Sequence, residues 1–132
     1  SPWAMHLQRQ YRHFINGLGE SVQYAKEQGG LYVRQDGRQF WSQDSASRLY
    51  LELNTAGMGK RQNSAPKSVP DAELEFGNGC ILRLWEQDVW DGYNREWVPG
   101  VFVWYRGANG KIYMYDTDRM QWQTLVRCLP EE

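Results

Sequence analysis

Four carboxylates fall within thirteen residues in the stretch WEQDVWDGYNREW, Trp85 to Trp97, which also holds three of the seven tryptophans. Paired carboxylates can act as general acid and base, and several oxygens from one loop can bind a hard cation such as calcium. The stretch lacks the alternating acids and the fixed glycine of an EF-hand loop. Paired carboxylates alone are also too common to indicate a glycosidase. We therefore expect a solvated acidic loop without metal ligands or catalytic residues.

Histidine and cysteine chemistry is also poorly supported. His6 and His13 are the two histidines, and at a rise of about 1.5 Å per residue along one helix they would lie roughly 10 Å apart, too far to share a metal ion. A Ser-His-Asp or Cys-His nucleophile would have to recruit one of them across the fold. We expect both to be solvated residues on a helix surface. Cys80 and Cys128 belong to no CxxC pattern and are expected to be buried, reduced thiols.

A basic segment, AGMGKRQNSAPKSVP from Ala56 to Pro70, contains no acid and carries a net charge of +3. Its GMGK sequence invites comparison with a phosphate-binding P-loop. The comparison fails, because Asn54 stands where the first motif glycine is needed and Arg61 stands where serine or threonine should follow the lysine. The segment is predicted to be a long loop within residues 56–72. Its basic side chains could contact an anion: Lys60, Arg61 and Lys67.

The composition is that of one globular domain. The chain has 132 residues, of which 41% are hydrophobic and 23% charged, and the formal charge of −1 argues against a generally basic nucleic-acid binder. No apolar run approaches the roughly 20 residues of a membrane span, and no N-x-S/T sequon occurs, so we expect an intracellular protein with no membrane partner. Residues 1–5, SPWAM, resemble a remnant of an expression tag, which would leave residues 6–132 as the domain.

The first element is predicted to be a helix over residues 6–28. Apolar residues recur there at steps of three or four: Leu7, Tyr11, Phe14, Leu18, Val22 and Ala25. Gly17 and Gly19 weaken the middle by up to about 1 kcal/mol each, so one bent helix and two short helices both remain open. Gly29 and Gly30 end the element.

Residues 31–128 are predicted to form an antiparallel β-structure. Asp36-Gly37 marks a hairpin within 31–41, and RLYLEL, residues 48–53, alternates as a half-buried strand does. Two further hairpins are expected around glycines 77–79 and 107–110. The fold class is therefore α+β, with the N-terminal helix packed on a sheet of about six or seven strands.

Near the C-terminus, Tyr115, Asp116 and Trp122 resemble the Y-D-x5-W pattern of a kelch repeat. A propeller needs several such repeats at a fixed period, and the chain holds no second copy. Locally the pattern predicts a strand, an aspartate-initiated turn and a return strand that carries Trp122.

Aromatic residues give the main functional signal. The 85–97 stretch is predicted to be a protruding hairpin or loop with a net charge of −3, in which Trp85 points to the more polar face of the sheet. Phe102 with Trp104, and Tyr113 with Tyr115, form two stripes that could pair on one sheet face, either beneath the helix or as an exposed platform.

Two binding hypotheses follow, both without a cofactor, and we favour either of them over an enzyme because no catalytic constellation is present. The first is a protein-interaction module, since tryptophan and tyrosine are enriched at interface hot spots. The second is a cradle that stacks a flat or cationic group, such as a nucleobase, an RNA cap, single-stranded nucleic acid or a sugar ring, between aromatic side chains. The predicted binding residues are Trp85, Glu86, Trp90, Tyr93, Glu96 and Trp97.

Overall fold

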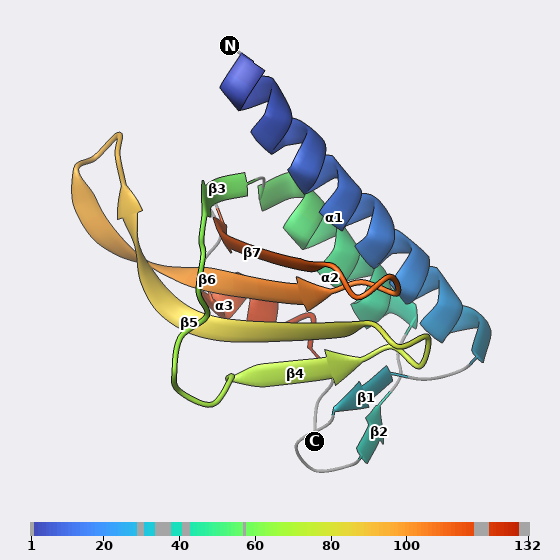
Figure 1. Cartoon of the computed structure of the whole chain (residues 1–132). Helices are drawn as coiled ribbons and strands as arrows, with labels where there is room; N and C mark the ends of the chain where they lie inside the picture. Colours follow the sequence, from blue (N-terminus) through green and yellow to red (C-terminus); the bar gives the residue numbers. More distant parts are fainter. Residues whose placement is uncertain are drawn as a thin grey trace.

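In a computed structural model, three helices and one antiparallel sheet account for most of the residues described, which are 2–28, 31–33, 38–40, 43–56, 58–117 and 122–129 (Figure 1). The elements are α1 (Pro2–Gln28), β1 (Leu31–Val33), β2 (Arg38–Phe40), α2 (Gln43–Ala56), β3 (Met58–Arg61), β4 (Ala72–Glu75), β5 (Ile81–Asp91), β6 (Glu96–Arg106), β7 (Ile112–Thr117) and α3 (Trp122–Val126). No helix among the described residues is long and apolar enough to cross a membrane.

The sheet has the strand order β2-β1-β4-β5-β6-β7-β3, and every neighbouring pair is antiparallel. Five strands, β4-β5-β6-β7-β3, form its body, and the three-residue strands β1 and β2 extend one edge. The predicted α+β class is confirmed, although the expected six or seven strands slightly exceed the five of the body. The predicted hairpins β1–β2, β4–β5 and β6–β7 are all present, while the Asp36-Gly37 turn lies outside the described residues.

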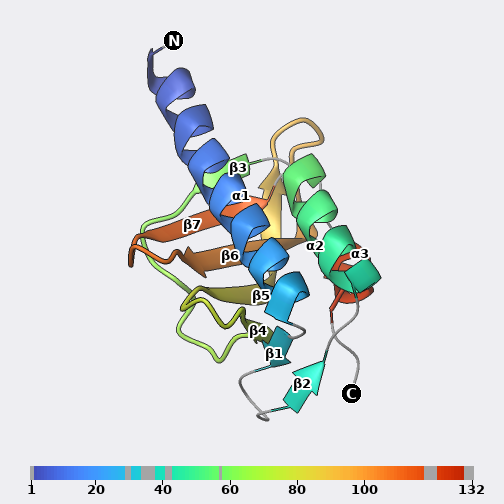
Figure 2. The ribbon, with the colours of Figure 1, turned by 90° about the vertical axis from the view of Figure 1, so that its right-hand side faces the viewer.

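Helix α1 packs on one face of the sheet through the stripe that the sequence predicts. Phe14, Leu18, Val22 and Ala25 are all buried, and α1 is one continuous helix that begins at Pro2. Gly19 allows α2 to approach closely, because a Cβ at this position would lie 3.0 Å from the Tyr50 ring. Figure 2 shows α1 and α2 side by side over the same face of the sheet. The helical cover is therefore a pair of helices where the sequence predicted one.

The strand predicted at residues 48–53 is wrong, because this segment lies inside α2. Leu49 and Leu53 are buried, as both a strand and a helix would have them, but Leu51 is 56% exposed. A strand would place Leu51 on the same face as Leu49 and Leu53, whereas a helix turns it away from them toward solvent. Ala46, three residues before Leu49, completes the buried helical stripe.

The segment predicted as one long loop over residues 56–72 is partly wrong as well. Its first part forms β3, which pairs with β7 at the edge of the sheet. Residues 62–71 then cross the sheet from β3 to β4 on the face opposite the helices, as Figure 1 shows. We call residues 62–71 the strap. Ala65 of the strap packs against a cluster of buried side chains on that face, so the strap covers part of it. The cluster consists of Ile81, Trp85, Phe102 and Trp104.

Buried tyrosines link α1 to the sheet. The Tyr105 ring lies 5.4 Å from the Phe14 ring, and the Tyr105 hydroxyl is 2.7 Å from that of Ser21. Asn78 donates to the Ser21 hydroxyl at 3.2 Å, which ties the β4–β5 turn to the same helix. Cys80 is buried beside this network, and both Cys80 and Cys128 are free, as predicted for buried thiols.

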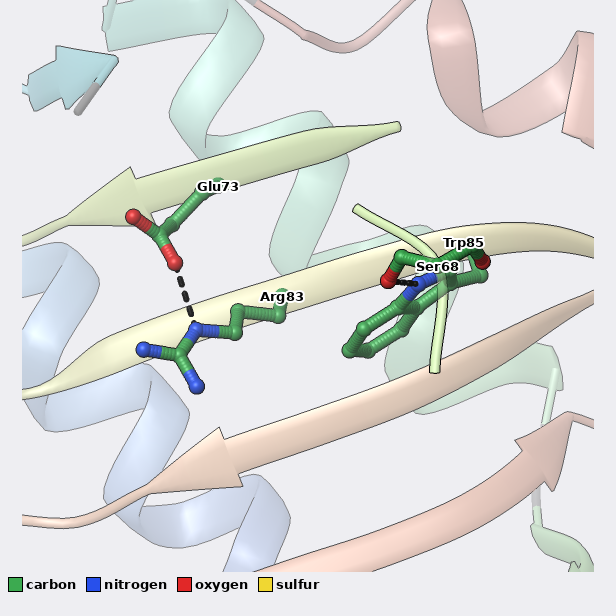
Figure 3. A network of polar contacts seen from close by, with 4 residues as sticks. All are labelled: Ser68, Glu73, Arg83 and Trp85. Atoms are coloured by element: carbon green, nitrogen blue, oxygen red, sulfur yellow. Dashed lines mark hydrogen bonds and ion pairs between the residues drawn. The ribbon is translucent and has the colours of Figure 1, made fainter. Parts of the chain in front are cut away.

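On the opposite sheet face, a second cluster contains Ile81, Trp85, Phe102 and Trp104. Trp85 donates its indole N–H to the Ser68 carbonyl of the strap at 3.0 Å (Figure 3). Arg83 pairs with Glu73, and its guanidinium lies 4.2 Å from the centre of the Trp104 ring. The expected pairing of the two aromatic stripes is wrong, because the register places Phe102 opposite Asp116. The tyrosine stripe instead faces the helices.

The return strand predicted to carry Trp122 is also wrong. Trp122 begins α3, a short helix whose Leu125 is buried in the helix-side core together with Cys128 and Leu129. Residues 31–128 are therefore not all β-structure, since α2 and α3 interrupt them.

Candidate binding site on the β5–β6 arm

Strands β5 and β6 continue well beyond the body of the sheet. The β4–β5 register ends at Ala72 opposite Leu84, and the β6–β7 register ends at Phe102 opposite Asp116, whereas β5 and β6 stay paired as far as Asp91 opposite Glu96. Residues 86–100 thus form a two-stranded ribbon, which we call the arm. Figure 1 shows it projecting from the sheet at the left of the view. The predicted protruding hairpin is present.

Three large aromatic side chains are exposed on the arm. Trp90 is 54% exposed, Tyr93 94% and Trp97 67%. Trp90 lies directly opposite Trp97, and their ring centres are 5.5 Å apart at an angle of 65°. Tilted aromatic pairs of this kind stabilise a hairpin by about 0.5–1.5 kcal/mol beyond the area they bury. The contact between Trp90 and Trp97 therefore stabilises the arm, while part of each ring stays exposed to solvent.

Asp91 organises the turn at the tip of the arm. Its carboxylate accepts the backbone N–H groups of Tyr93 and Asn94, at 3.0 and 3.1 Å, and the side-chain amide of Asn94 at 2.8 Å. These hydrogen bonds, led by the one from the Asn94 backbone, hold the pKa of Asp91 below its ordinary value. Arg95 completes the turn with a positive φ of 56°. The carboxylate of Asp91 therefore stabilises the turn at the tip of the arm.

The six predicted binding residues do not gather at one place. Trp85 is only 5% exposed and belongs to the cluster beneath the strap. Glu86 and Trp90 lie on the same face of β5, since side chains two or four residues apart on a strand share a face. Glu96, which neighbours Trp97 on β6, points to the other face. The exposed aromatic residues and Glu86 therefore form the candidate site, without Trp85.

A pocket of about 940 Å³ lies between the tip of the arm and the ends of β3 and β7. Its arm side includes Trp90, Tyr93 and Trp97, and its other side includes Lys60 and Asp116. The sequence did not place the basic segment near the aromatic residues; the structure does so for Lys60. Arg61 is exposed on β3, and Lys67 is exposed on the strap, but neither lines this pocket.

Asp116 also lines the pocket, which the sequence analysis did not predict. There it was expected only to initiate a turn. Its Oδ2 accepts a hydrogen bond of 2.6 Å from the Gln62 side chain, while its buried Oδ1 has no partner among the described residues. Burial raises the pKa of Asp116, and the Gln62 hydrogen bond and the nearby Lys60 charge oppose that rise. Its position at the end of β7, beside β3, depends on a strand pairing that no local pattern announced.

No match was found when the chain was compared with protein-family models, with curated proteins and with solved structures. Within the described residues, no three His, Cys, Asp or Glu side chains lie close enough to hold a metal ion. His6 and His13 are both exposed on α1, as predicted. The chemistry of this surface must therefore be inferred from the geometry of the arm.

Gly100 lies where the arm meets the body of the sheet, and it leaves room for the Val89 side chain. Its replacement by alanine is expected to lower the free energy of unfolding by about 1–3 kcal/mol. A Cβ at Gly100 would lie 2.6 Å from Cγ2 of Val89, and valine is too stiff at χ1 to move aside. Urea denaturation measures the effect. Gly92→Ala is the matched control, since no atom of the described residues lies within 4 Å of its Cβ position. Equal stability of the two variants would contradict the tight contact, and Gly100→Ala combined with Val89→Ala should recover most of the loss.

Proposed function

We propose that this chain is a non-enzymatic binding module whose arm anchors a protein partner. The observation that carries the proposal is the exposure of Trp90, Tyr93 and Trp97 together on a hairpin that leaves the body of the fold. Tryptophan and tyrosine dominate the binding energy of protein interfaces, because they bury a large apolar area with few rotatable bonds. Contiguous exposed apolar surface of this kind typically marks an interaction site.

The charge of the arm favours a basic partner. Four carboxylates against Arg95 give the arm a net charge of −3. Opposite charge around an apolar centre steers association and contributes to the choice of partner, and this contribution weakens as salt screens the charges. Association should therefore be faster at low ionic strength.

A ligand cradle is the second candidate, and the position of Lys60 is the observation that supports it. Lys60 lines the same pocket as Trp90 and Tyr93, so a phosphate and a stacked base could be held together. The ring planes argue against it, because Trp90 and Trp97 are inclined at 65° and do not form a parallel slot for a flat group. The protein-partner proposal is the better supported of the two.

Titrations that follow intrinsic tryptophan fluorescence test the two candidates. The panel contains blocked peptides of alternating lysine and valine, nucleotides and cap analogues, short RNA and DNA oligomers, and oligosaccharides. We expect saturable binding of the basic peptides, weakened at least tenfold in Trp97→Ala, since loss of a hot-spot residue costs about 2 kcal/mol or more. The control is Leu51→Ala, which removes another exposed apolar side chain from α2, remote in the fold from the arm, and should bind normally.

The outcomes separate the hypotheses. Binding confined to nucleotides or oligosaccharides and dependent on Trp97 would replace the protein partner with the cradle. Binding that is unaffected in Trp97→Ala would remove the arm from either site. Circular dichroism of each variant should match the parent protein, so that a change in affinity is not a change in folding.

A further inference from the structure

The two outer edges of the arm differ in the main-chain groups they present. On β5, the even-numbered residues direct their N–H and C=O groups away from β6. The Leu84 carbonyl accepts the Asp71 N–H at 2.9 Å, and the Glu86 N–H donates to the Asp71 carboxylate at 2.7 Å. The register has no shift along the arm, so alternation directs the main-chain groups of Asp88 and Trp90 outward as well.

On β6, the odd-numbered residues point toward β7 in the same way. The Val101 carbonyl accepts the Thr117 hydroxyl at 3.1 Å, and the Gly107 N–H donates to the Lys111 carbonyl at 2.9 Å. By the same alternation, Pro99 faces outward on the arm, and proline has no N–H to donate. Proline is one of the residues that keep an edge strand from pairing further. The β6 edge is therefore closed to another strand.

We infer that the open β5 edge, at Asp88 and Trp90, accepts one extended segment of a basic protein partner as an added strand. This inference rests on the proposed function and specifies how the partner binds. In the part of the chain that the structure describes, no strand pairs beyond Leu84 with the edge of β5 that faces away from β6, so an added strand would continue the line of β4. Main-chain hydrogen bonds would supply affinity, and alternate side chains would reach Asp88 and Trp90 on one face.

Charge decides the nature of the occupant. Two arms of this protein would each bring a net charge of −3, so pairing between copies is opposed by repulsion. The same carboxylates that discourage self-association favour a segment with lysine or arginine at alternate positions. The aliphatic stems of those basic residues would also cover the Trp90 ring, because Asp88 and Trp90 lie on the same face of β5.

Proline substitution tests the edge directly. Asp88→Pro removes the outward N–H without removing a bond to β6, because Asp88 lies opposite Pro99 at a position where both main chains face outward. Asp88→Asn removes the same charge and keeps the N–H. With the blocked lysine–valine peptide as probe, we expect Asp88→Pro to bind at least about fivefold more weakly than Asp88→Asn, as loss of one main-chain hydrogen bond implies.

Amide hydrogen exchange provides a second measurement on the unaltered protein. Addition of the peptide should slow exchange at Asp88 and Trp90 and leave the exchange of Gln87 and Val89, which face β6, unchanged. Equal binding by the two Asp88 variants, or unchanged exchange at Asp88 and Trp90, would overturn the added strand. If Trp97→Ala still weakened peptide binding at least tenfold in that case, the arm would remain the binding site and only the proposed mode of binding would be wrong. Protection of both amides by self-association, without peptide, would overturn the basic partner.

Discussion

Replacement of Trp85 by alanine is expected to lower the free energy of unfolding by about 3–5 kcal/mol, the range typical of a large aromatic side chain removed from a core. Trp85 is 5% exposed, and its ring centre lies 5.6 Å from that of Phe102 in an edge-on arrangement. The substitution would also leave the Ser68 carbonyl without its indole donor and would loosen the strap above the cluster. Urea denaturation followed by circular dichroism measures the loss.

Trp90→Ala is the matched control, because it removes the same side chain from the same strand at a position that is 54% exposed. Its cost should stay near 1 kcal/mol, the value of its contact with Trp97. A third variant, Trp85→Phe, keeps an aromatic ring in the cluster and should recover more than half of the loss. If Trp85→Ala and Trp90→Ala were equally stable, the division of the tryptophans into structural and binding residues would be wrong.

Sequence periodicity was sufficient to predict the secondary structure of those segments whose pattern fits only a helix or only a strand. The stripe from Phe14 to Ala25 fits a helix and no strand, and the glycine-rich turns at 77–79 and 107–110 connect alternating segments that lie within hairpins. It was insufficient at residues 48–53. Leu49 and Leu53 are four residues apart, a spacing that is even and also close to one helical turn, so only the exposure of Leu51 distinguishes the two structures.

The site depended on information that lies outside any local pattern. The aromatic and acidic composition indicated the arm, and its projection followed from two strands longer than their neighbours. The burial of Trp85 depends on the strap, which crosses the sheet because β3 pairs with β7 at the far edge. The same pairing brings Lys60 and Asp116 to the pocket beside Trp90. Long-range strand order decided these positions, and a single sequence does not encode it in a form that spacing reveals.

Stability is expected to fall as the pH rises from about 10 to 12, because tyrosines in the helix-side core resist ionisation. Burial is the main cause in each case: it raises the pKa of Tyr11 to about 12, and it raises the pKa of Tyr105 and of Tyr115. In the unfolded chain these groups ionise near pH 10, so between the two pKa values the unfolded state binds fewer protons than the folded state. The free energy of unfolding therefore decreases with pH through this window and is unaffected below it.

Tyr11 is partly exposed to solvent, which screens its share of the effect, and we expect a total loss of about 1–3 kcal/mol across the window. Urea denaturation at a series of pH values measures the slope. Tyr105→Phe lowers stability at neutral pH, since it removes the hydroxyl bonded to Ser21, but it should flatten the alkaline slope. Tyr93→Phe, at a side chain that is 94% exposed, should leave the slope unchanged. A slope that is the same in both variants would mean that the core tyrosines do not carry the alkaline transition, and the packing of α1 on Tyr105 would then need revision.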